Sequence, residues 1–454
     1  MGFVLTILYF VTAFLGPVTV FGPLAAFHIE LILAALVLLV SLPKLQGSFI
    51  FRTPQSLALV GLAFAIFVSI LATGWISGAF TAFLTFIPSA FAYFLVCLHC
   101  NSKKRLQIVV LMLLFVCVFV IANGYSDLRQ QTSAGDDPTT MDRPYLLAQE
   151  SDAGEWFYRI RGQDFINDPN DFAQLIVCLV PLVFIFWQRK KTFKNLAFVI
   201  LPVSVLLFGA FLTHSRGSVL AIMAMTVVAG RRRIGTVPSL LLAVALFAGA
   251  SALNFTGGRD ISVESGAGRL DLWGDGLDLL KSHPLFGVGF GGMADYTGGL
   301  TAHNSLVVCA AELGLFGLYF WSLFLFPTGR DILVIASPDK VNEGEPIVVE
   351  QTPPWQVTEK IETVDREEVC RLGRLMLLSF TGFLVAGWFL SRAFVMTLFL
   401  LGGMAEVLFE MALRQGMVSP RMPPARVLRF AGVLAISMLV LMYVMLRITN
   451  LTTH

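Results

Sequence analysis

Apolar stretches of about 20 residues recur along this chain, and they limit its possible folds more than any other feature. About 20 helical residues are needed to cross the hydrocarbon core of a bilayer. Of the 454 residues, 56% are hydrophobic and 14% are charged, whereas a soluble domain carries about 25% charged residues. The sequence therefore predicts an all-α polytopic integral membrane protein.

The pattern of apolar stretches predicts about 12–13 transmembrane helices. The first stretch, which begins MGFVLTILYF, lacks the positive segment of a cleaved signal peptide, so we expect it to be retained as a span. The expected spans lie near residues 3–20, 24–42, 55–72, 77–99, 106–123, 171–187, 196–212, 217–230, 238–254, 304–326, 373–390, 393–411 and 430–447.

The short loops between these spans alternate in charge. Loops rich in Lys and Arg remain in the cytoplasm, so we expect the positive set to be cytoplasmic and the other set to face the opposite side of the membrane. The positive set contains Lys44, Arg52, Lys103, Lys104, Arg105, Arg189, Lys190, Lys191, Lys194, Arg231, Arg232, Arg233, Arg414, Arg421, Arg426 and Arg429.

These assignments divide the chain into seven expected parts. One of them, an insert at 327–372, is polar, rich in Glu and interrupted by Pro, which favours a weakly structured connector over a regulatory docking segment. The parts are N-terminal transmembrane helices at 1–123, a periplasmic loop at 124–170, central transmembrane helices at 171–254, a large periplasmic loop at 255–303, a transmembrane helix at 304–326, a cytoplasmic insert at 327–372 and C-terminal transmembrane helices at 373–454.

The turn LTHSRGS at 212–218 places Arg216 between two apolar spans on the expected outer face. An arginine at the end of a span is often a snorkelling residue. Here it stands beside His214 and directly before Gly217 and the next helix. A helix N-terminus offers N–H groups and partial positive charge to anions. The turn therefore predicts an anion site at the membrane surface, with His214 and Gly217 shaping it.

The large loop carries a second candidate, Arg269. Between about 266 and 281, apolar residues recur at helical spacing, which predicts an amphipathic helix lying on the outer leaflet. Arg269 near its start is placed to reach a phosphate, although a surface arginine paired with Asp271 is the alternative. The apolar positions are Leu270, Trp273, Leu277 and Leu280, and the polar positions between them include Asp271, Asp275 and Asp278.

The same loop ends with a glycine run and a histidine. Gly287 and Gly289 belong to a G-x-G-x-G-G run, but no strand–turn–helix unit surrounds it, so we expect a tight turn rather than a dinucleotide site. His303 stands where the loop meets a span. Its ordinary pKa lies near about 6.5, so it is suited to proton transfer, although a histidine at a helix start is more often a hydrogen-bonding residue.

A third candidate region is RGQDFINDPNDFA at 161–173. Asp168 and Asn170 are expected to form a turn and a helix cap. Arg159 and Arg161 precede them, and capping does not explain these two arginines. The C-x-x-C spacing of Cys97 and Cys100 has no second pair, so we expect packing residues and neither a metal site nor a cofactor.

Five blocks taken together resemble the bacterial O-antigen ligase and polymerase (Wzy/ligase-type) superfamily of membrane glycosyltransferases. The resemblance covers residues 100–325, and SRAFVMTLFLLGGM at 391–404 is similar to an O-glycosylation ligase subgroup linked to exopolysaccharide or exosortase systems. The blocks, in the order of the family, are RGQDFINDPNDFA (161–173), LTHSRGS (212–218), GRLDLW (268–273), HPLFGVGF (283–290) and AHNSLVVCAAELGLFG (302–317).

The resemblance implies transfer of a glycan from undecaprenyl diphosphate to an acceptor hydroxyl on a lipid, a protein or another glycan, without metal or nucleotide sugar. It implies that Arg216 and Arg269 hold the diphosphate and that His303 assists the transfer. Arg161 is a further candidate for the same anion pocket. No nucleic acid partner is expected, because no basic patch is interleaved with aromatic residues.

Two other functions remain open from the sequence. A Wzy-type polysaccharide polymerase shares these motifs. A transporter or flippase for a lipid-linked sugar belongs to another class, and such proteins tend to carry ionisable groups within spans, broken helices and inverted repeats. The candidate residues here cluster at span ends, which favours the enzyme.

Overall fold

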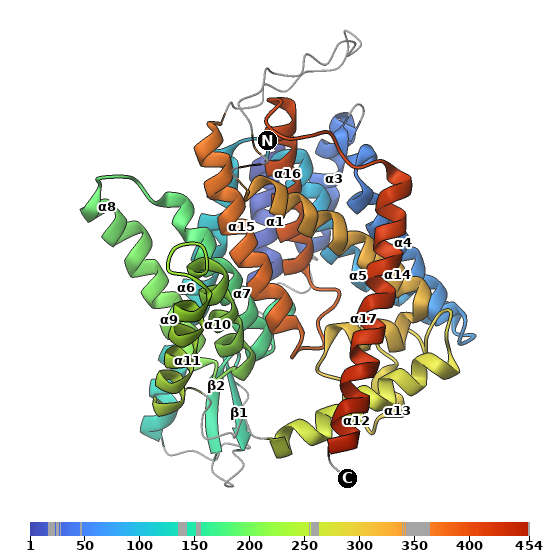
Figure 1. Ribbon diagram of the computed structural model, residues 1–454. Helices are drawn as coiled ribbons and strands as arrows, with labels where there is room; N and C mark the ends of the chain where they lie inside the picture. Colours follow the sequence, from blue (N-terminus) through green and yellow to red (C-terminus); the bar gives the residue numbers. More distant parts are fainter. Residues whose placement is uncertain are drawn as a thin grey trace. The chain divides into compact units, whose positions relative to one another are not determined.

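A computed structural model of the chain describes residues 1–16, 23, 27, 29–45, 48–134, 143–150, 156–253, 255, 263–337, 339, 341 and 364–452 (Figure 1). Residues 342–363 of the predicted cytoplasmic insert lie outside the described residues. The chain divides into two compact units, which are described separately. Unit 1 consists of Met1–Gln46, Leu98–Asp260 and Pro354–Ala386, and unit 2 consists of Gly47–Cys97, Ile261–Pro353 and Gly387–His454.

Unit 1 is built mainly from apolar helices. Its elements are α1 (Gly2–Leu15), α3 (Ile29–Leu45), α6 (Lys103–Ala134), β1 (Leu146–Glu150), β2 (Trp156–Ile160), η3 (Asp164–Ile166), α7 (Pro169–Val183), η4 (Phe184–Phe186), α8 (Thr192–Asn195), η5 (Leu196–Ile200), α9 (Leu201–Leu212), α10 (Arg216–Gly230), α11 (Thr236–Ala252) and α15 (Arg366–Gly387). Helix α7 packs against α6, α9 and α10. The Ser379 hydroxyl of α15 donates to the Cys178 carbonyl of α7 at 2.7 Å, so α7 lies at the centre of this unit.

A two-stranded antiparallel hairpin interrupts the helices of unit 1. Leu146 lies opposite Ile160 and Glu150 lies opposite Trp156. The sequence predicted only a loop between 124 and 170, so this hairpin is an addition to the all-α expectation. The second strand reads WFYRI, and aromatic and β-branched residues favour strands. Strand β2 packs against α6 and α9, which places the hairpin beside the end of α9.

Unit 2 is organised around one long helix. Its elements are η2 (Phe49–Arg52), α4 (Pro54–Leu71), α5 (Ile76–His99), α12 (Val263–Ser282), α13 (Met293–Tyr296), α14 (Ser305–Ile335), α16 (Met396–Arg414) and α17 (Pro424–Thr452). Helix α14 packs against α4, α12, α16 and α17. Its start is fixed by Asn304, whose side-chain oxygen accepts from the Leu306 and Val307 N–H groups at 2.9 and 3.2 Å.

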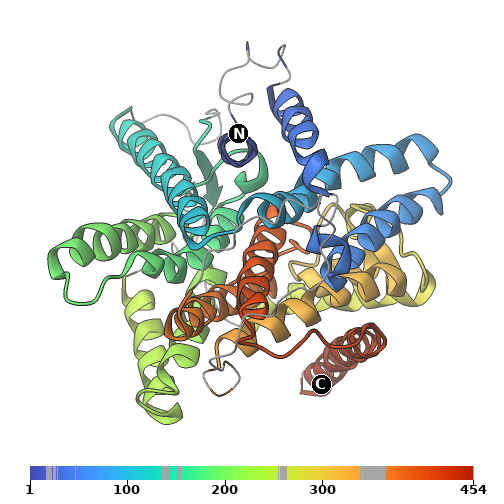
Figure 2. The same ribbon diagram turned by 90° about the horizontal axis from the view of Figure 1, so that it is seen from above.

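The predicted amphipathic helix is present as α12. Figures 1 and 2 show it running crosswise to the long axis of α17. Trp273 and Leu277, which were predicted on its apolar face, are buried, whereas the three aspartates predicted on its polar face are exposed. A Cβ added to Gly276 would lie 2.3 Å from the Val307 side chain of α14. The apolar stripe therefore docks α12 closely onto α14.

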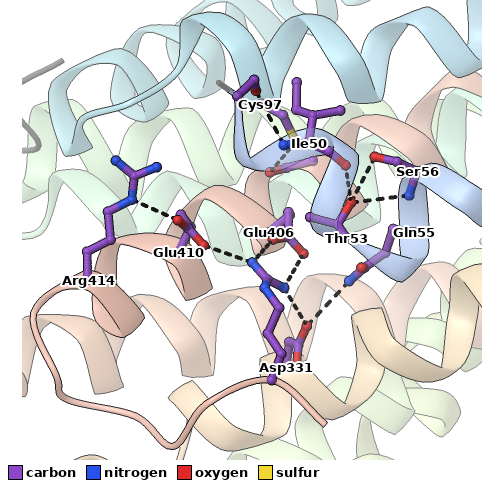
Figure 3. A network of polar contacts seen from close by, with 12 residues as sticks. Ile50, Thr53, Gln55, Ser56, Cys97, Asp331, Glu406, Glu410 and Arg414 are labelled. Carbon is purple, nitrogen blue, oxygen red and sulfur yellow. Dashed lines mark hydrogen bonds and ion pairs between the residues drawn. The ribbon is translucent and has the colours of Figure 1, made fainter. Parts of the chain in front are cut away.

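An ion-pair network closes the end of unit 2 at which α14 and α16 finish. Arg421 donates to the carboxylates of Glu406 and Glu410 and lies 3.9 Å from that of Asp331. Figure 3 shows these three carboxylates facing one another, with Gln55 directed at Asp331. Burial alone would lower the pKa of the Arg421 guanidinium, but the carboxylates raise it above its usual value. The network therefore holds the segment between α16 and α17 against α14.

The architecture confirms the predicted all-α polytopic membrane fold. Among the described residues, nine helices are long and apolar enough to cross a membrane, and three shorter apolar helices accompany them. Each of the thirteen predicted spans overlaps a helix. Large apolar side chains also remain exposed on the outer helix faces, including Leu241 at 66% on α11 and Ile436 at 64% on α17. Such surfaces are stable against lipid rather than water.

Several helices extend further than the sequence predicted, among them α6, which continues to Ala134 beyond its expected end at residue 123. Helix α14 continues to Ile335, beyond the expected end at residue 326, and α15 begins at Arg366 rather than at residue 373. Pro327 favoured a helix end because it has no N–H group. Inside the packed unit the helix passes through this proline, and the Thr328 hydroxyl donates to the Phe324 carbonyl at 2.7 Å.

Candidate active site

The LTHSRGS turn joins α9 to α10 in unit 1. His214 adopts a left-handed backbone with φ of +49°. This residue reverses the chain, and α10 then begins directly at Arg216, whose side chain is half-buried. Gly217 has no positive φ, so its backbone conformation does not require glycine, and its predicted role in close approach stays a prediction. Arg216 thus stands at the first position of α10, one residue before the start at 217 that the sequence predicted.

A buried arginine holds this turn in place. Arg159 of β2 is 3% exposed and donates its Nε–H to the Thr213 carbonyl at 2.7 Å. Its two Nη groups donate to the side chains of Gln149 at 2.9 Å and Asn170 at 2.7 Å. Hydrogen bonds from a charged group contribute about 1.5–3 kcal/mol each. Arg159 therefore joins the hairpin, the start of α7 and the turn that carries Arg216.

His214 supports the same turn. Its Nδ1 lies 3.0 Å from the Phe255 carbonyl, and its ring packs edge-on against Phe157 with centroids 5.5 Å apart. The Phe211 ring lies 5.6 Å away. His214 is thus held between two aromatic rings and a main-chain carbonyl, and its role in shaping the site stays a prediction.

The NDPND segment forms the predicted helix cap. The Asp168 carboxylate accepts from the Asn170 N–H at 2.7 Å, and Pro169 occupies the first position of α7. Asn170 in turn accepts from Arg159. Arg161 follows β2, is half-buried and donates its main-chain N–H to the Tyr145 carbonyl at 3.1 Å. Asp168 and Asn170 thus belong to the start of α7, and Arg161 directly follows the end of β2.

In unit 2, α12 carries Arg269 on the same face as Trp273. Residues four apart share one face of a helix, with Cβ atoms about 5–6 Å apart, so Arg269 lies one turn before Trp273. The Trp273 Nε1–H donates to the Ala302 carbonyl at 2.7 Å. Trp273 also packs edge-on against Trp388 with centroids 6.0 Å apart. This contact fixes the helix of Arg269 to the residue that precedes His303.

His303 occupies an exposed position just before the Asn304 cap of α14. Its φ is +47°, in the left-handed region that side-chain-bearing residues seldom adopt. The His303 N–H donates to the Ser391 hydroxyl at 2.8 Å, from the segment between α15 and α16. This main-chain conformation therefore places the His303 side chain just before the start of α14.

The glycine run packs against a break in α14. Gly287, Gly289 and Gly291 all have positive φ, which confirms the predicted tight turn. Helix α14 is interrupted at Gly314, with φ of +63° and ψ of −165°. The Gly289 N–H donates to the Glu312 carbonyl at 3.0 Å, so the loop satisfies backbone groups that the break releases.

More hydrogen bonds join the loop and the broken helix. The Val288 N–H donates to the Ala311 carbonyl at 3.0 Å, and the Leu315 N–H donates to the Pro284 carbonyl at 2.8 Å. The buried Glu312 carboxylate accepts from backbone N–H groups of the same loop. A Cβ at Gly287 would lie 2.3 Å from the Glu312 main chain. The glycines are thus required by a backbone-to-backbone approach rather than by a nucleotide.

The cysteines pack inside the helices. All six are buried and free. Burial raises the pKa of the Cys100 thiol to about 12, so this thiol stays protonated near neutral pH. Among the described residues, no group of three or more His, Cys, Asp or Glu side chains is arranged to hold a metal ion.

The predicted site residues fall in both units. Arg161, Asp168, Asn170, His214, Arg216 and Gly217 belong to unit 1, and Arg269, Gly287, Gly289 and His303 belong to unit 2. Sequence reasoning did not assign the contacts of Arg159 and Ser391. Arg159 was named in the sequence only as one of two arginines that helix capping does not explain. Ser391 appeared only as the first residue of the block at 391–404.

Comparison with known proteins places seven of the ten candidate residues within a family domain. Residues 201–322 match the model of the O-antigen ligase family, Wzy_C. No curated protein matches the chain. The matched segment contains Arg216, Arg269 and His303 together with the glycine run. It is carried by a polytopic helical fold of the kind that the resemblance implied. The chain thus carries, over residues 201–322, a segment that matches the O-antigen ligase family.

Proposed function

We propose that the protein transfers a glycan from undecaprenyl diphosphate to an acceptor hydroxyl at the periplasmic face of the bacterial inner membrane. The acceptor is a lipid, a protein or a second glycan. The reaction needs no metal and no nucleotide sugar. This proposal rests on the family domain at 201–322 and on the positions of Arg216 and His303 at the starts of helices.

The observation that carries the proposal is the placement of Arg216 at the first residue of α10. A helix N-terminus directs N–H groups and partial positive charge toward an anion. A guanidinium at the same point adds a bidentate donor that fits a phosphate. The ligand with this chemistry at a membrane surface is a lipid-linked diphosphate. Buried Arg159 fixes the turn, so the donors are oriented before the ligand arrives.

The residues of both units take separate roles in the proposed transfer. The acceptor oxygen attacks the anomeric carbon while the bond from that carbon to the diphosphate oxygen breaks. Arg216 and Arg269 stabilise the negative charge that grows on the leaving diphosphate, and Arg161 is a further contributor. His303 takes the proton from the acceptor hydroxyl. The products are the glycosylated acceptor and undecaprenyl diphosphate.

The charge of unit 2 supports the proposed orientation. Helix α14 begins after His303, and at its other end lie Arg330, Arg414 and Arg421. Positive residues flank the cytoplasmic ends of spans. The arginine-rich end is therefore assigned to the cytoplasm, and the end with His303 to the periplasm.

A transporter is disfavoured by the way the break in α14 is filled. A broken helix with a buried carboxylate beside it is a feature that transporters use to line a substrate path. Here the freed backbone groups near Gly314 bond to the loop that carries Gly287 and Gly289. Their hydrogen-bonding capacity is thus used in packing.

The lipid-linked glycan pool tests the proposal in cells that carry either the wild-type chain or Arg216→Ala. We expect the variant to accumulate diphosphate-linked glycan on the outer face and to lack the final conjugate. A pool trapped on the cytoplasmic face would instead establish a flippase. Chain-length analysis of the product then separates the two transferases, because a polymerase variant loses long chains while a ligase variant loses the conjugate. Activity should survive EDTA.

A further inference from the structure

The backbone of His303 is held in a strained conformation. A residue with a side chain at φ of +47° lies in the left-handed region, at a cost of about 1–3 kcal/mol. Such a conformation persists only where neighbouring groups hold it. The neighbouring groups therefore decide where the imidazole points.

Ser391 supplies the direct contact. Its hydroxyl oxygen accepts the His303 N–H at 2.8 Å, and its hydroxyl hydrogen is donated to the Thr301 Oγ1 at 2.8 Å. These bonds join the two ends of the turn before α14 to one side chain. Because its hydrogen is already donated to Thr301, the Ser391 hydroxyl is engaged in the turn rather than presented to an acceptor.

Flanking bonds keep Ser391 itself in register. The Ser305 hydroxyl donates to the Leu390 carbonyl at 2.8 Å and accepts the Arg392 N–H at 3.1 Å. Two residues after Ser391, the Ala393 carbonyl accepts the Nε1–H of Trp321 of α14 at 3.0 Å. The segment from 390 to 393 is therefore bonded to α14 on both sides of Ser391.

We infer that Ser391 is a positioning residue, which acts on the transfer only through the conformation of His303. This inference rests on the proposed function, in which His303 takes the acceptor proton. Removal of the hydroxyl leaves the His303 N–H without its acceptor and frees the strained φ to relax. The imidazole then moves away from the acceptor, while the diphosphate-binding arginines keep their places.

Turnover of purified protein tests this inference, with donor and acceptor both supplied by an extract of host cells that lack the gene and release of undecaprenyl diphosphate as the readout. We expect Ser391→Ala to lower kcat about tenfold to a hundredfold, the size of effect that a misplacement of about 1 Å produces. The donor KM should stay close to that of wild type, because the substitution leaves the proposed diphosphate-binding arginines unchanged. Ser391→Thr keeps the hydroxyl and should restore most of kcat. Ser322→Ala is the matched control, since Ser322 is a buried serine of α14 whose hydroxyl has no hydrogen-bond partner among the described residues.

A double-mutant cycle separates positioning from any independent role. Asn tolerates the left-handed region, so His303→Asn removes the imidazole while it keeps the turn. We expect Ser391→Ala to cause no further loss in the His303→Asn background, because coupled residues are not additive. An equal loss in both backgrounds would overturn the inference.

The failures of the two proposals can be told apart. Wild-type turnover in His303→Asn refutes the role of His303 in the proposed function. If His303→Asn is impaired and Ser391→Ala has wild-type turnover, the positioning role of Ser391 is refuted and the proposed function stands. Amide hydrogen exchange gives an independent measurement. The exchange rate of the His303 amide should rise in Ser391→Ala and should equal that of wild type in Ser322→Ala.

Discussion

The Nε–H of buried Arg159 donates to the main-chain carbonyl of Thr213 across 2.7 Å. Fifty-four residues of sequence separate the two. The bond attaches a β-hairpin to the turn in front of α10, and Arg216 is the first residue of that helix. The orientation of Arg216 therefore depends on a second arginine that is itself buried.

Replacement of Arg159 should impair the turn even when the positive charge is kept. Lys has no planar fork, so Arg159→Lys cannot bond Thr213, Gln149 and Asn170 at once. Loss of one charge-assisted bond costs about 1.5–3 kcal/mol. We expect a lower melting temperature in detergent and a drop in transfer of about tenfold, the factor that about 1.4 kcal/mol produces.

Arg143 provides the control for this prediction. It is a less buried arginine whose Nη1 bonds the Gln130 side chain and the Asp127 carbonyl at 3.3 Å. Arg143→Ala should change stability and transfer only slightly. Equal losses in the two variants would show that the turn does not depend on Arg159.

Arg216→Ala and Arg269→Ala should each reduce transfer by about a hundredfold to a thousandfold, the effect of removing one preorganised donor from a developing anion. Both residues are outside the long apolar spans, so the amount of protein in the membrane should not change. Arg231→Ala, at the other end of α10, is the matched control and should retain wild-type transfer. Normal transfer in Arg269→Ala would exclude Arg269 from the proposed diphosphate site.

Trp273→Phe removes one hydrogen bond while it keeps an aromatic ring in the core. The Ala302 carbonyl loses its donor, and the turn that carries His303 is no longer fixed to α12. We expect kcat to fall about tenfold with the protein still folded, since the ring contact with Trp388 is largely preserved. Trp75→Phe, at a residue 62% exposed, should have no effect on kcat.

Gly314→Ala should destabilise unit 2 by at least about 1–3 kcal/mol, because its backbone conformation is essentially restricted to glycine. The added Cβ would also lie 2.4 Å from the Leu285 carbonyl oxygen. Gly249→Ala in α11 is the comparison, since a Cβ there meets nothing within 4 Å. Alanine favours helices over glycine, so Gly249→Ala should be neutral or stabilising. Thermal melting of both variants in the same detergent measures the difference.

Arg421→Met should lower stability by about 3–5 kcal/mol, because it leaves the buried Glu406 carboxylate without its partner, whereas Glu410 keeps its ion pair with Arg414. A second substitution, Glu406→Met, should recover part of this loss. Arg426→Ala serves as the control at an exposed position of α17. The network lies at the opposite end of α14 from His303, so turnover per folded molecule should stay unchanged.

The sequence predicted the features that depend on local composition. All thirteen spans overlap a helix, because an apolar run must be helical to satisfy its backbone within a membrane. The amphipathic helix, the Asp168 cap and the positive φ of Gly287 and Gly289 also follow from residues close in sequence.

The features that were missed depend on contacts between distant parts of the chain. Ser391 and His303 are 88 residues apart, and nothing in either local sequence indicates that they meet. Gly314 stands in an apolar run that is compatible with an unbroken helix, and only the approach of Leu285 explains its conformation. The hairpin was missed because its strands are short and are separated from each other by polar residues.

The pairing of the glycine loop with the break in α14 restricts how this protein can vary in length. The Leu315 N–H bonds the Pro284 carbonyl while the Val288 N–H bonds the Ala311 carbonyl, so the two segments are matched residue by residue. One inserted or deleted residue between Pro284 and Val288 would shift every later donor past its acceptor. Relatives should therefore keep a fixed loop length here, and insertions should accumulate in other loops instead.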